Sequence, residues 1–243
     1  MSTDGARDWT LVGAREPYFG VVSAPRFRAA ALDGRAIEEF YASGQADIDR
    51  ARAWCVEDLG AAPEGGRALD IGAGLGRLTL AMARHAREVV GFDPAPTMLE
   101  KARARAAETG ATNAAFVGAL PEGPFDWISS YIVFQHIPPA DGLVLLERAL
   151  AGAAPRAFLT LHIAAWTDAR VAPSRTLVSR LASALLRARA RAGAAPVETL
   201  IRMHAYNLSD VMARLVAAGF PRATFRHVDH DGHHGVWIIA RRA

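Results

Sequence analysis

The part of the sequence that most constrains the fold is residues 68–77, where an apolar run ends in Asp70 and three glycines then alternate at Gly72, Gly74 and Gly76. The apolar periodicity changes there from that of a strand to that of a helix, which predicts a strand, a tight turn and a helix. Glycine has no Cβ, so the chain can turn sharply and its backbone can approach a ligand closely. The following helix would direct its free N–H groups at the same place. We therefore expect a cofactor cradle at this turn.

A second strand, predicted over residues 88–93, also ends in an acid, Asp93, which lies 17 residues after Gly76. Dinucleotide-binding folds place a carboxylate near this position, where it accepts hydrogen bonds from both ribose hydroxyls of the cofactor. One carboxylate suits two vicinal hydroxyls because it has two acceptor oxygens. Thr97 and Glu100 fit a capping box at the start of the next helix.

The remaining elements are predicted from hydrophobic periodicity and from turn residues. Strands are expected over residues 67–71, 113–118, 125–131, 157–163, 223–228 and 235–240, and helices over residues 35–60, 75–86, 97–109, 141–151, 174–191 and 207–219. Asp231 and Gly232 lie between the last two strands, and this dipeptide is a hairpin signal. The chain is therefore expected to end in a helix followed by an antiparallel hairpin.

With the Leu-Asp-Ile that precedes it, the G-x-G-x-G pattern resembles motif I of the class I S-adenosylmethionine (SAM)-dependent methyltransferases. Residues 125–138 resemble motif IV and its following loop in the small-molecule members, where the strand end is followed by a Gln-His or His-His pair. The resemblance covers about residues 67–163. It implies an α/β protein, a three-layer αβα Rossmann-like sandwich whose mostly parallel seven-stranded sheet carries an antiparallel C-terminal hairpin strand. It also implies SAM as cofactor and S-adenosylhomocysteine as product.

We divide the chain into an N-terminal arm with covering helices, residues 1–60, and a SAM-dependent methyltransferase domain, residues 61–243. Residues 1–34 are expected to be irregular, because Pro17 and Pro25 argue against a long helix. Their aromatic side chains indicate an arm that packs its rings on the main domain, a flap over the cofactor pocket, or both.

A helical insertion at about residues 164–206 follows the fifth strand and marks a lid or an oligomer contact. Within it, residues 174–191 predict an amphipathic helix with leucines against arginines. The arginines form either a solvated face or a surface that attracts an anionic substrate. One interpretation of this helix is a homodimer contact.

The cofactor site is predicted at the carboxyl ends of the strands and in the segments that cover them. The resemblance places a helix over the methionine end of SAM, where Gly44 permits close approach, although Ser43-Gly44 equally fits a break between two helices. Many members of the family carry an acid after the third strand to bind the adenine amino group, and this sequence has none there. The predicted cofactor-binding residues are Tyr18, Gly44, Asp70, Gly72, Ala73, Gly74, Gly76, Asp93, Pro94, Met98, Ala119, Leu120, Ser130 and Gln135.

The acceptor site is predicted around His136, which follows the fourth strand and is the candidate catalytic base. Histidine suits proton removal because its unperturbed pKa is about 6.5, although the residue also fits a loop cap. His162 interrupts the apolar fifth strand, either as a core residue or as a pocket residue. The predicted acceptor-binding residues are Phe19, Tyr131, His162, Trp166, His204 and Tyr206. The histidines near the C-terminus match no closed zinc pattern, so no metal site is expected.

Composition narrows the class of function. Hydrophobic residues make up 51% of the chain, and the formal net charge of +3 is too small to indicate a nucleic-acid-binding surface. Cys55 is the single cysteine, so no internal disulfide can form and a reducing compartment fits. Neither a signal peptide nor a membrane-spanning segment is apparent. We expect a cytoplasmic protein that binds neither nucleic acid nor membrane.

These observations predict transfer of the sulfonium methyl group by an SN2 reaction to an oxygen or nitrogen of a small-molecule acceptor. Residues 129–132, Ser-Ser-Tyr-Ile, replace the Asp/Asn-Pro-Pro-Tyr of enzymes that methylate planar amino or amide nitrogen. No cysteine lies near the fourth strand, unlike in cytosine C5 methyltransferases. Two alternatives stay open. One is a nicotinamide-dependent oxidoreductase on a doubly wound fold, and the other is a SAM-binding protein that uses SAM for non-methylating chemistry.

Overall fold

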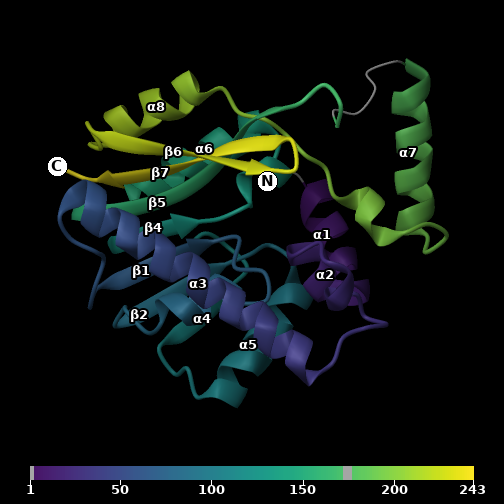
Figure 1. Ribbon diagram of the computed structural model, residues 1–243, viewed down its shortest axis with the longest axis horizontal. Coiled ribbons are helices and arrows are strands. Elements are labelled where there is room, and N and C mark those ends of the chain that lie inside the picture. The colour runs from purple at the N-terminus through teal and green to yellow at the C-terminus, as the bar shows by residue number, and fades with distance from the viewer. Residues whose placement is uncertain (1–2, 172–176) are drawn as a thin grey trace.

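A computed structural model describes residues 3–171 and 177–243. Within these residues, seven strands form one sheet in the order β3-β2-β1-β4-β5-β7-β6 (Figure 1). The strands are β1 (Arg67–Ile71), β2 (Glu88–Phe92), β3 (Ala114–Val117), β4 (Phe125–Ser130), β5 (Ala153–Thr167), β6 (Ala223–His230) and β7 (His233–Arg241). The first five are parallel, and β7 pairs antiparallel with both β5 and β6. The predicted sheet and its C-terminal hairpin are confirmed.

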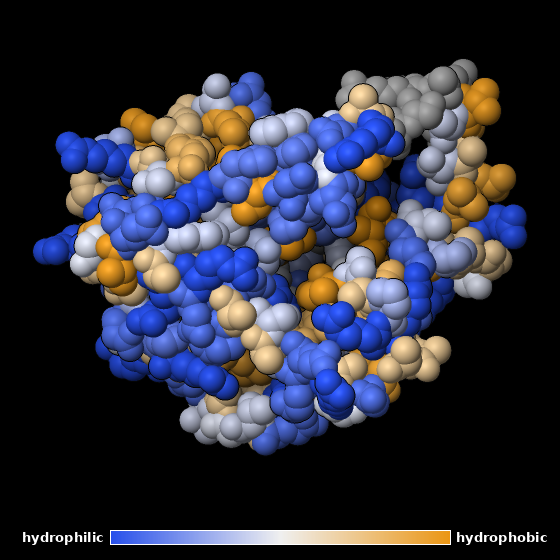
Figure 2. Space-filling view, in the orientation of Figure 1, coloured by the Kyte–Doolittle hydropathy of each residue, from blue (hydrophilic) through white to orange (hydrophobic). Residues whose placement is uncertain are grey.

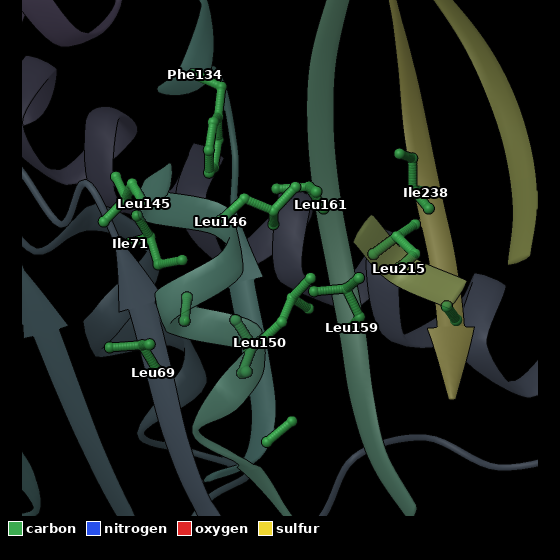
Figure 3. Close-up of a cluster of buried hydrophobic side chains, with 14 of the residues drawn as sticks. Leu69, Ile71, Phe134, Leu145, Leu146, Leu150, Leu159, Leu161, Leu215 and Ile238 are labelled. Atoms are coloured by element: carbon green, nitrogen blue, oxygen red, sulfur yellow. The ribbon is translucent and has the colours of Figure 1, made fainter. Parts of the chain in front are cut away.

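Helices cover both faces of the sheet, which confirms the three layers. They are α1 (Thr3–Arg15), α2 (Pro17–Val21), α3 (Gly34–Leu59), α4 (Arg77–Met82), α5 (Pro96–Thr109), α6 (Pro139–Ala151), α7 (Leu177–Arg191) and α8 (Leu208–Ala217), with 3₁₀ turns η1 (Pro25–Phe27), η2 (Phe134–His136) and η3 (Val197–Leu200). Side chains of α3 and α4 pack on one face of the sheet. Those of α6 and α8 pack on the other face, where Leu146 and Leu215 lie beside strands of the sheet (Figure 3). Among the described helices, none is long and apolar enough to cross a membrane.

The prediction of an irregular N-terminal arm is wrong, because α1, α2 and η1 occupy most of residues 3–27. The two prolines do not interrupt helices but begin them: Pro17 is the first residue of α2 and Pro25 the first residue of η1. Proline is favoured there because the first N–H of a helix has no partner in any case. Helix α1 packs on α5 and η3, which brings the arm over the sheet edge where the parallel strands end.

The predicted break at Ser43-Gly44 is also wrong, because α3 runs without interruption from Gly34 to Leu59. A Cβ on Gly44 would lie 2.4 Å from the carbonyl oxygen of Arg77, so this glycine lets α3 pack closely on α4. The capping box is absent as well. Thr97 donates to the carbonyl of Thr10 in α1 instead, and Ala95 is the cap residue of α5.

The region after β5 contains the inserted helix. Strand β5 extends through Thr167, so the first residues of the predicted insertion belong to the sheet. Helix α7 contacts η3 and stands apart from the sheet (Figure 1). Three of its leucines are solvent-exposed, with Leu181 at 62%, Leu185 at 63% and Leu186 at 44%. Ser174 and Arg175, predicted to begin this helix, lie outside the described residues.

The chain's first helix is tied to α7 by an ion pair. Arg191 donates from Nε and Nη2 to the two carboxylate oxygens of Asp8, at 2.7 and 2.9 Å. Asp8 is buried, and its carboxylate is matched by this guanidinium. Two segments that are far apart in the sequence are therefore held side by side.

Candidate functional site

A cavity of about 670 Å³ lies over the ends of the parallel strands and beneath the N-terminal arm. One face of the molecule is hollowed near its centre, with apolar side chains around the hollow (Figure 2). The cavity is lined at one end by the glycine turn after β1 and by Asp93 after β2. At its other end it is lined by residues of β5, β7 and the loop after β4. The arrangement agrees with the rule that ligands of open α/β sheets bind at the carboxyl ends of the strands.

The glycine turn has the backbone shape that the sequence predicts. Gly72, Gly74 and Gly76 have φ angles of 79°, 50° and 79°, a region that side chains with a Cβ rarely adopt. Gly72 and Gly74 line the cavity. Gly76 does not, and a Cβ there would lie 2.9 Å from the ring of Phe116, so this glycine serves the packing of the turn against β3.

Asp93 is the carboxylate that faces the cavity at this end. Its Oδ2 accepts from the N–H of Gly74 at 3.0 Å, and its Oδ1 accepts from the N–H of Ala95 at 2.9 Å. Burial raises the pKa of this carboxyl to about 6, against the opposing effect of the two N–H donors. Each oxygen keeps a further lone pair, so the carboxylate can still accept two hydrogen bonds from a ligand. The prediction for Asp93 fits this geometry.

Asp70, by contrast, lies beneath the turn and does not line the cavity. Its Oδ2 accepts from Thr79 Oγ1 at 2.6 Å, while Oδ1 is buried without a partner. Burial raises the pKa of Asp70 to about 6. The position of this side chain indicates that it holds the start of α4 rather than a ligand.

The other predicted cofactor-binding residues divide into two groups. Pro94, Met98 and Gln135 line the cavity together with Gly72, Gly74 and Asp93. Those that do not line it are Tyr18, Gly44, Ala73, Ala119, Leu120 and Ser130.

Local contacts explain the second group. Tyr18 packs against Phe40 with ring centroids 5.0 Å apart, and Ser130 donates to the carbonyl of Ile71 at 3.0 Å. Ala73 and Leu120 face apolar clusters, and Ala119 is exposed.

His136 lines the cavity, at the end of η2. Its Nδ1 lies 2.8 Å from the carbonyl oxygen of Arg202, so Nδ1 carries the proton and Nε2 is left as an acceptor. Burial lowers the pKa of this imidazole to about 4, and the ring is therefore neutral at pH 7. The ring of Trp9 meets it edge-on at 5.1 Å. The other nitrogen, Nε2, lies 3.5 Å from Nε2 of Gln135, whose amide donates to it. A neutral imidazole whose Nδ1 is held and whose Nε2 can accept a proton has the arrangement of a general base.

The N-terminal arm contributes to the cavity through residues that the sequence did not single out. Trp9 of α1 and residues 20–23, at the end of α2 and directly after it, line the cavity, while Phe19 does not. The ring of Phe19 is covered by the guanidinium of Arg28 at 3.7 Å. The arm therefore both packs its rings on the domain and covers the cavity, as the two interpretations allowed.

Of the remaining acceptor-site predictions, Tyr131 and His162 line the cavity and three residues do not. Tyr206 is buried and its hydroxyl donates to the carbonyl of Ile137 at 2.9 Å. Trp166 is 48% exposed and stacks on His234 outside the cavity. His204 packs beside the cavity, where its backbone N–H donates to the carbonyl of Gln135 at 2.6 Å.

Sequence reasoning missed several lining residues. His230, His233 and Gly235 at the β6–β7 turn reach the cavity because β7 pairs with β5. Arg77 and Asp47 also line it, as an ion pair 2.6 Å apart in which Ser43 Oγ joins at 3.1 Å. The one available signal was the spacing of Ser43 and Asp47, which places both on one side of α3. Among the described residues, no group of three acidic, histidine or cysteine side chains is arranged to hold a metal ion.

Comparisons with known proteins agree with this geometry. Residues 68–155 match the family model described as a methyltransferase domain. Two curated bacterial relatives are 23S rRNA (uracil(1939)-C(5))-methyltransferases RlmD. The one from Alkalilimnicola ehrlichii is 43% identical over 30% of this chain and 17% of its own length, and the one from Burkholderia thailandensis is 38% identical over 37% and 21%. The chain thus spans about a fifth of the length of these relatives.

Solved structures match over most of the chain. Magnesium protoporphyrin IX methyltransferase from Synechocystis PCC 6803, with S-adenosylhomocysteine bound, is 22% identical over 97% of this chain and 100% of its own, with a TM-score of 0.61. The 1,6-didemethyltoxoflavin-N1-methyltransferase from Burkholderia thailandensis is 20% identical over 90% and 91%, with a TM-score of 0.53. At these identities the likeness establishes the fold.

Proposed function

We propose that this chain, a member of the class I SAM-dependent methyltransferases through its residues 68–155, transfers a methyl group from SAM to an oxygen or nitrogen of a small-molecule acceptor. The observation that carries the proposal is the continuity of the cavity. The glycine turn and Asp93 line one end of it, and His136, whose Nδ1 is held by the carbonyl of Arg202, lines the same space.

The cofactor end fits an adenosyl group. The positive φ angles of Gly72 and Gly74 expose backbone to the cavity, and the Asp93 carboxylate retains acceptor capacity for the two ribose hydroxyls. Pro94 and Met98 line the cavity beside it. SAM supplies an activated sulfonium methyl group when it is bound. The protein then has to align the acceptor with that methyl carbon, which contributes about 7–11 kcal/mol to catalysis.

His136 is the proposed base. Its Nε2 would accept the proton of the acceptor's hydroxyl or amine while the new bond to carbon forms, and the bond from Nδ1 to the carbonyl of Arg202 fixes the ring for that step. General base catalysis of this kind contributes about a hundredfold or more.

A small-molecule acceptor is favoured over RNA because the N-terminal arm covers the cavity with Trp9 and residues 20–23. The similarity to RlmD is confined to a fifth of that protein. The antiparallel β7 argues against the alternative of a nicotinamide-dependent oxidoreductase, whose sheet lacks such a hairpin.

The test measures ligand binding by calorimetry and then turnover of SAM with candidate acceptors. We expect the protein to bind SAM and S-adenosylhomocysteine and not NAD, and to release S-adenosylhomocysteine when it is incubated with SAM and a panel of small phenols, amines and carboxylic acids. Binding of NAD in place of SAM would favour the oxidoreductase. Binding of SAM with no product from any acceptor class would favour a SAM-binding protein with other chemistry. An oligoribonucleotide in the same panel tests for RNA as acceptor.

We also propose a cytoplasmic protein that forms a homodimer through α7. The buried thiol of Cys55 needs no oxidising compartment, and the exposed side chains of Val178, Leu181 and Leu185 offer an apolar face. Light scattering should report twice the chain mass, and Leu181→Glu with Leu185→Glu should reduce it to one chain. The exposed Val144→Glu in α6 is the control, and a monomeric wild-type protein would exclude the dimer.

A further inference from the structure

The end of the cavity away from the glycine turn is formed by four residues that we call the distal wall: Tyr131, His162, His230 and Gly235. His162 lies on β5 and Gly235 on β7, which are two and three strands away from β1 in the sheet. Neighbouring strands are about 4.8 Å apart, so the distal wall lies roughly 10–14 Å from the glycine turn. It is therefore available to the acceptor when the turn holds the cofactor.

His162 is the unusual member of the distal wall. It is 1% exposed, it lines the cavity, and its Nε2 has no hydrogen-bond partner among the described residues. Burial lowers the pKa of this imidazole to about 3, so the ring is neutral at pH 7. A buried polar atom without a partner is costly, and native proteins rarely leave one unpaired. A polar ligand atom that forms a hydrogen bond with His162 Nε2 would remove this cost.

The surroundings of His162 are flat and aromatic. The rings of Tyr131 and His230 lie 5.3 and 5.5 Å from it, and Trp237 stacks behind Tyr131 at 4.6 Å. A Cβ on Gly235 would lie 2.5 Å from His162 Nε2, so the absence of a side chain at position 235 makes room for this edge of the imidazole. Such walls favour a planar ring that can contact them face-on or edge-on.

Few charged side chains line the cavity. Of the described residues that line it, histidines apart, only Asp47, Arg77 and Asp93 are acidic or basic. Asp47 and Arg77 form an ion pair with each other, and Asp93 lies at the cofactor end. A charged acceptor group placed against the distal wall would therefore lose its hydration without gaining a counter-ion.

We infer that the distal wall binds the uncharged, hydroxylated aromatic ring of the acceptor, and that His162 Nε2 pairs with a ring hydroxyl. The statement that the bound ring belongs to the methyl acceptor rests on the proposed function. His162 selects and positions the acceptor, and His136 remains the base. A carboxylate or an ammonium group in place of the hydroxyl is excluded from this wall by its charge.

The test measures binding of three matched probes, 2-naphthol, 2-naphthoate and 2-methylnaphthalene, by ligand-observed NMR at pH 7 with and without S-adenosylhomocysteine. We expect 2-naphthol to bind at least tenfold more tightly than 2-naphthoate. His162→Phe should weaken 2-naphthol about tenfold and leave 2-methylnaphthalene unchanged, because only the hydroxyl loses its partner. His227→Phe, a histidine of β6 that does not line the cavity, is the matched control and should change neither.

Equal binding of 2-naphthoate and 2-naphthol would overturn the inference, as would an equal loss of both uncharged probes in His162→Phe. Gly235→Ala is the second variant, since its methyl group would press on His162 Nε2, and it should weaken 2-naphthol in the same way. The melting temperature of each variant reports whether it folds. If S-adenosylhomocysteine fails to bind while 2-naphthol behaves as expected, the proposed function fails and the distal wall stands.

Discussion

The two ends of the cavity are built in different ways. At the cofactor end, the backbone of Gly72 and Gly74 and one carboxylate, Asp93, supply the surface, and all three belong to one strand-turn-helix unit and its neighbouring strand. At the acceptor end, side chains from α1, η2, β5 and β7 meet after a long path through the chain. The first end is therefore fixed by local sequence, whereas the second depends on tertiary packing. Under the proposed function, this difference means that the cofactor would be bound mainly by backbone and the acceptor mainly by side chains.

The largest expected effect is at the cofactor end. Asp93→Ala should weaken SAM at least a hundredfold, because hydrogen bonds to a charged group contribute about 1.5–3 kcal/mol each and two are lost. Calorimetry with SAM measures this. Glu88→Ala, which removes an acid at the exposed start of β2, is the control and should leave the affinity unchanged. Near-normal SAM affinity of Asp93→Ala would show that this carboxylate does not bind the cofactor, and that the proposed cofactor end of the cavity is wrong.

The next effect is on turnover. His136→Ala should slow methyl transfer about a hundredfold, since it removes the base, while the affinity for SAM stays within a factor of about two. The measurement is single-turnover release of S-adenosylhomocysteine with any acceptor found in the panel. His227→Ala serves as the control. If His136→Ala turned over at the normal rate, the imidazole would be a loop-capping residue only.

The pH dependence of SAM affinity should differ from the pH dependence of the reaction rate, because the two ends of the cavity carry groups with different pKa values. The pKa of Asp93 is raised to about 6, so its carboxylate becomes protonated as the pH falls, and SAM affinity should drop about tenfold from pH 7 to pH 5. The pKa of His136 is lowered to about 4, so its ring stays neutral over the same range and the rate at saturating SAM should not fall with it. Asp70 titrates near the same pH as Asp93, and Asp70→Asn should retain the pH dependence of binding. A flat affinity profile would contradict the role of Asp93.

The smallest effect concerns the support beneath the turn. Thr79→Val removes the hydroxyl that donates to Asp70 Oδ2 and should lower the free energy of unfolding by about 1–3 kcal/mol. SAM affinity should change less than threefold, because Asp70 does not line the cavity. Urea denaturation and calorimetry measure the two quantities. Thr112→Val, at the exposed turn before β3, is the control. A large loss of SAM affinity with unchanged stability would place Asp70 in the binding site.

The comparison also explains how much the sequence predicted. The glycine turn and Asp93 followed from hydrophobic periodicity and from spacing within one local unit, and the three-layer fold followed from the resemblance that these residues carry. The hairpin turn at Asp231-Gly232 was predicted from its dipeptide, and both residues have positive φ angles, 53° and 87°. These features depend on contacts between residues that are close in the sequence.

The errors arose where a residue's partner is distant. Tyr206 and Trp166 were predicted in the cavity, but the hydroxyl of Tyr206 donates to the carbonyl of Ile137 and Trp166 stacks on His234. Trp9 was missed because its position over His136 depends on how α1 packs. Gly44 permits a close approach as expected, but to the backbone of Arg77. No pattern in a single sequence specifies which of several aromatic or small residues will meet across such distances.

The ion pair between Asp8 and Arg191 couples the position of α7 to that of α1, which covers the cavity. Asp8 precedes Trp9, whose ring contacts His136. Movement of α1 away from the cavity therefore requires the ion pair with Arg191 to break. A displacement of α7 would therefore pull on the helix that carries Trp9 over His136, although α1 and α7 lie far apart in the sequence.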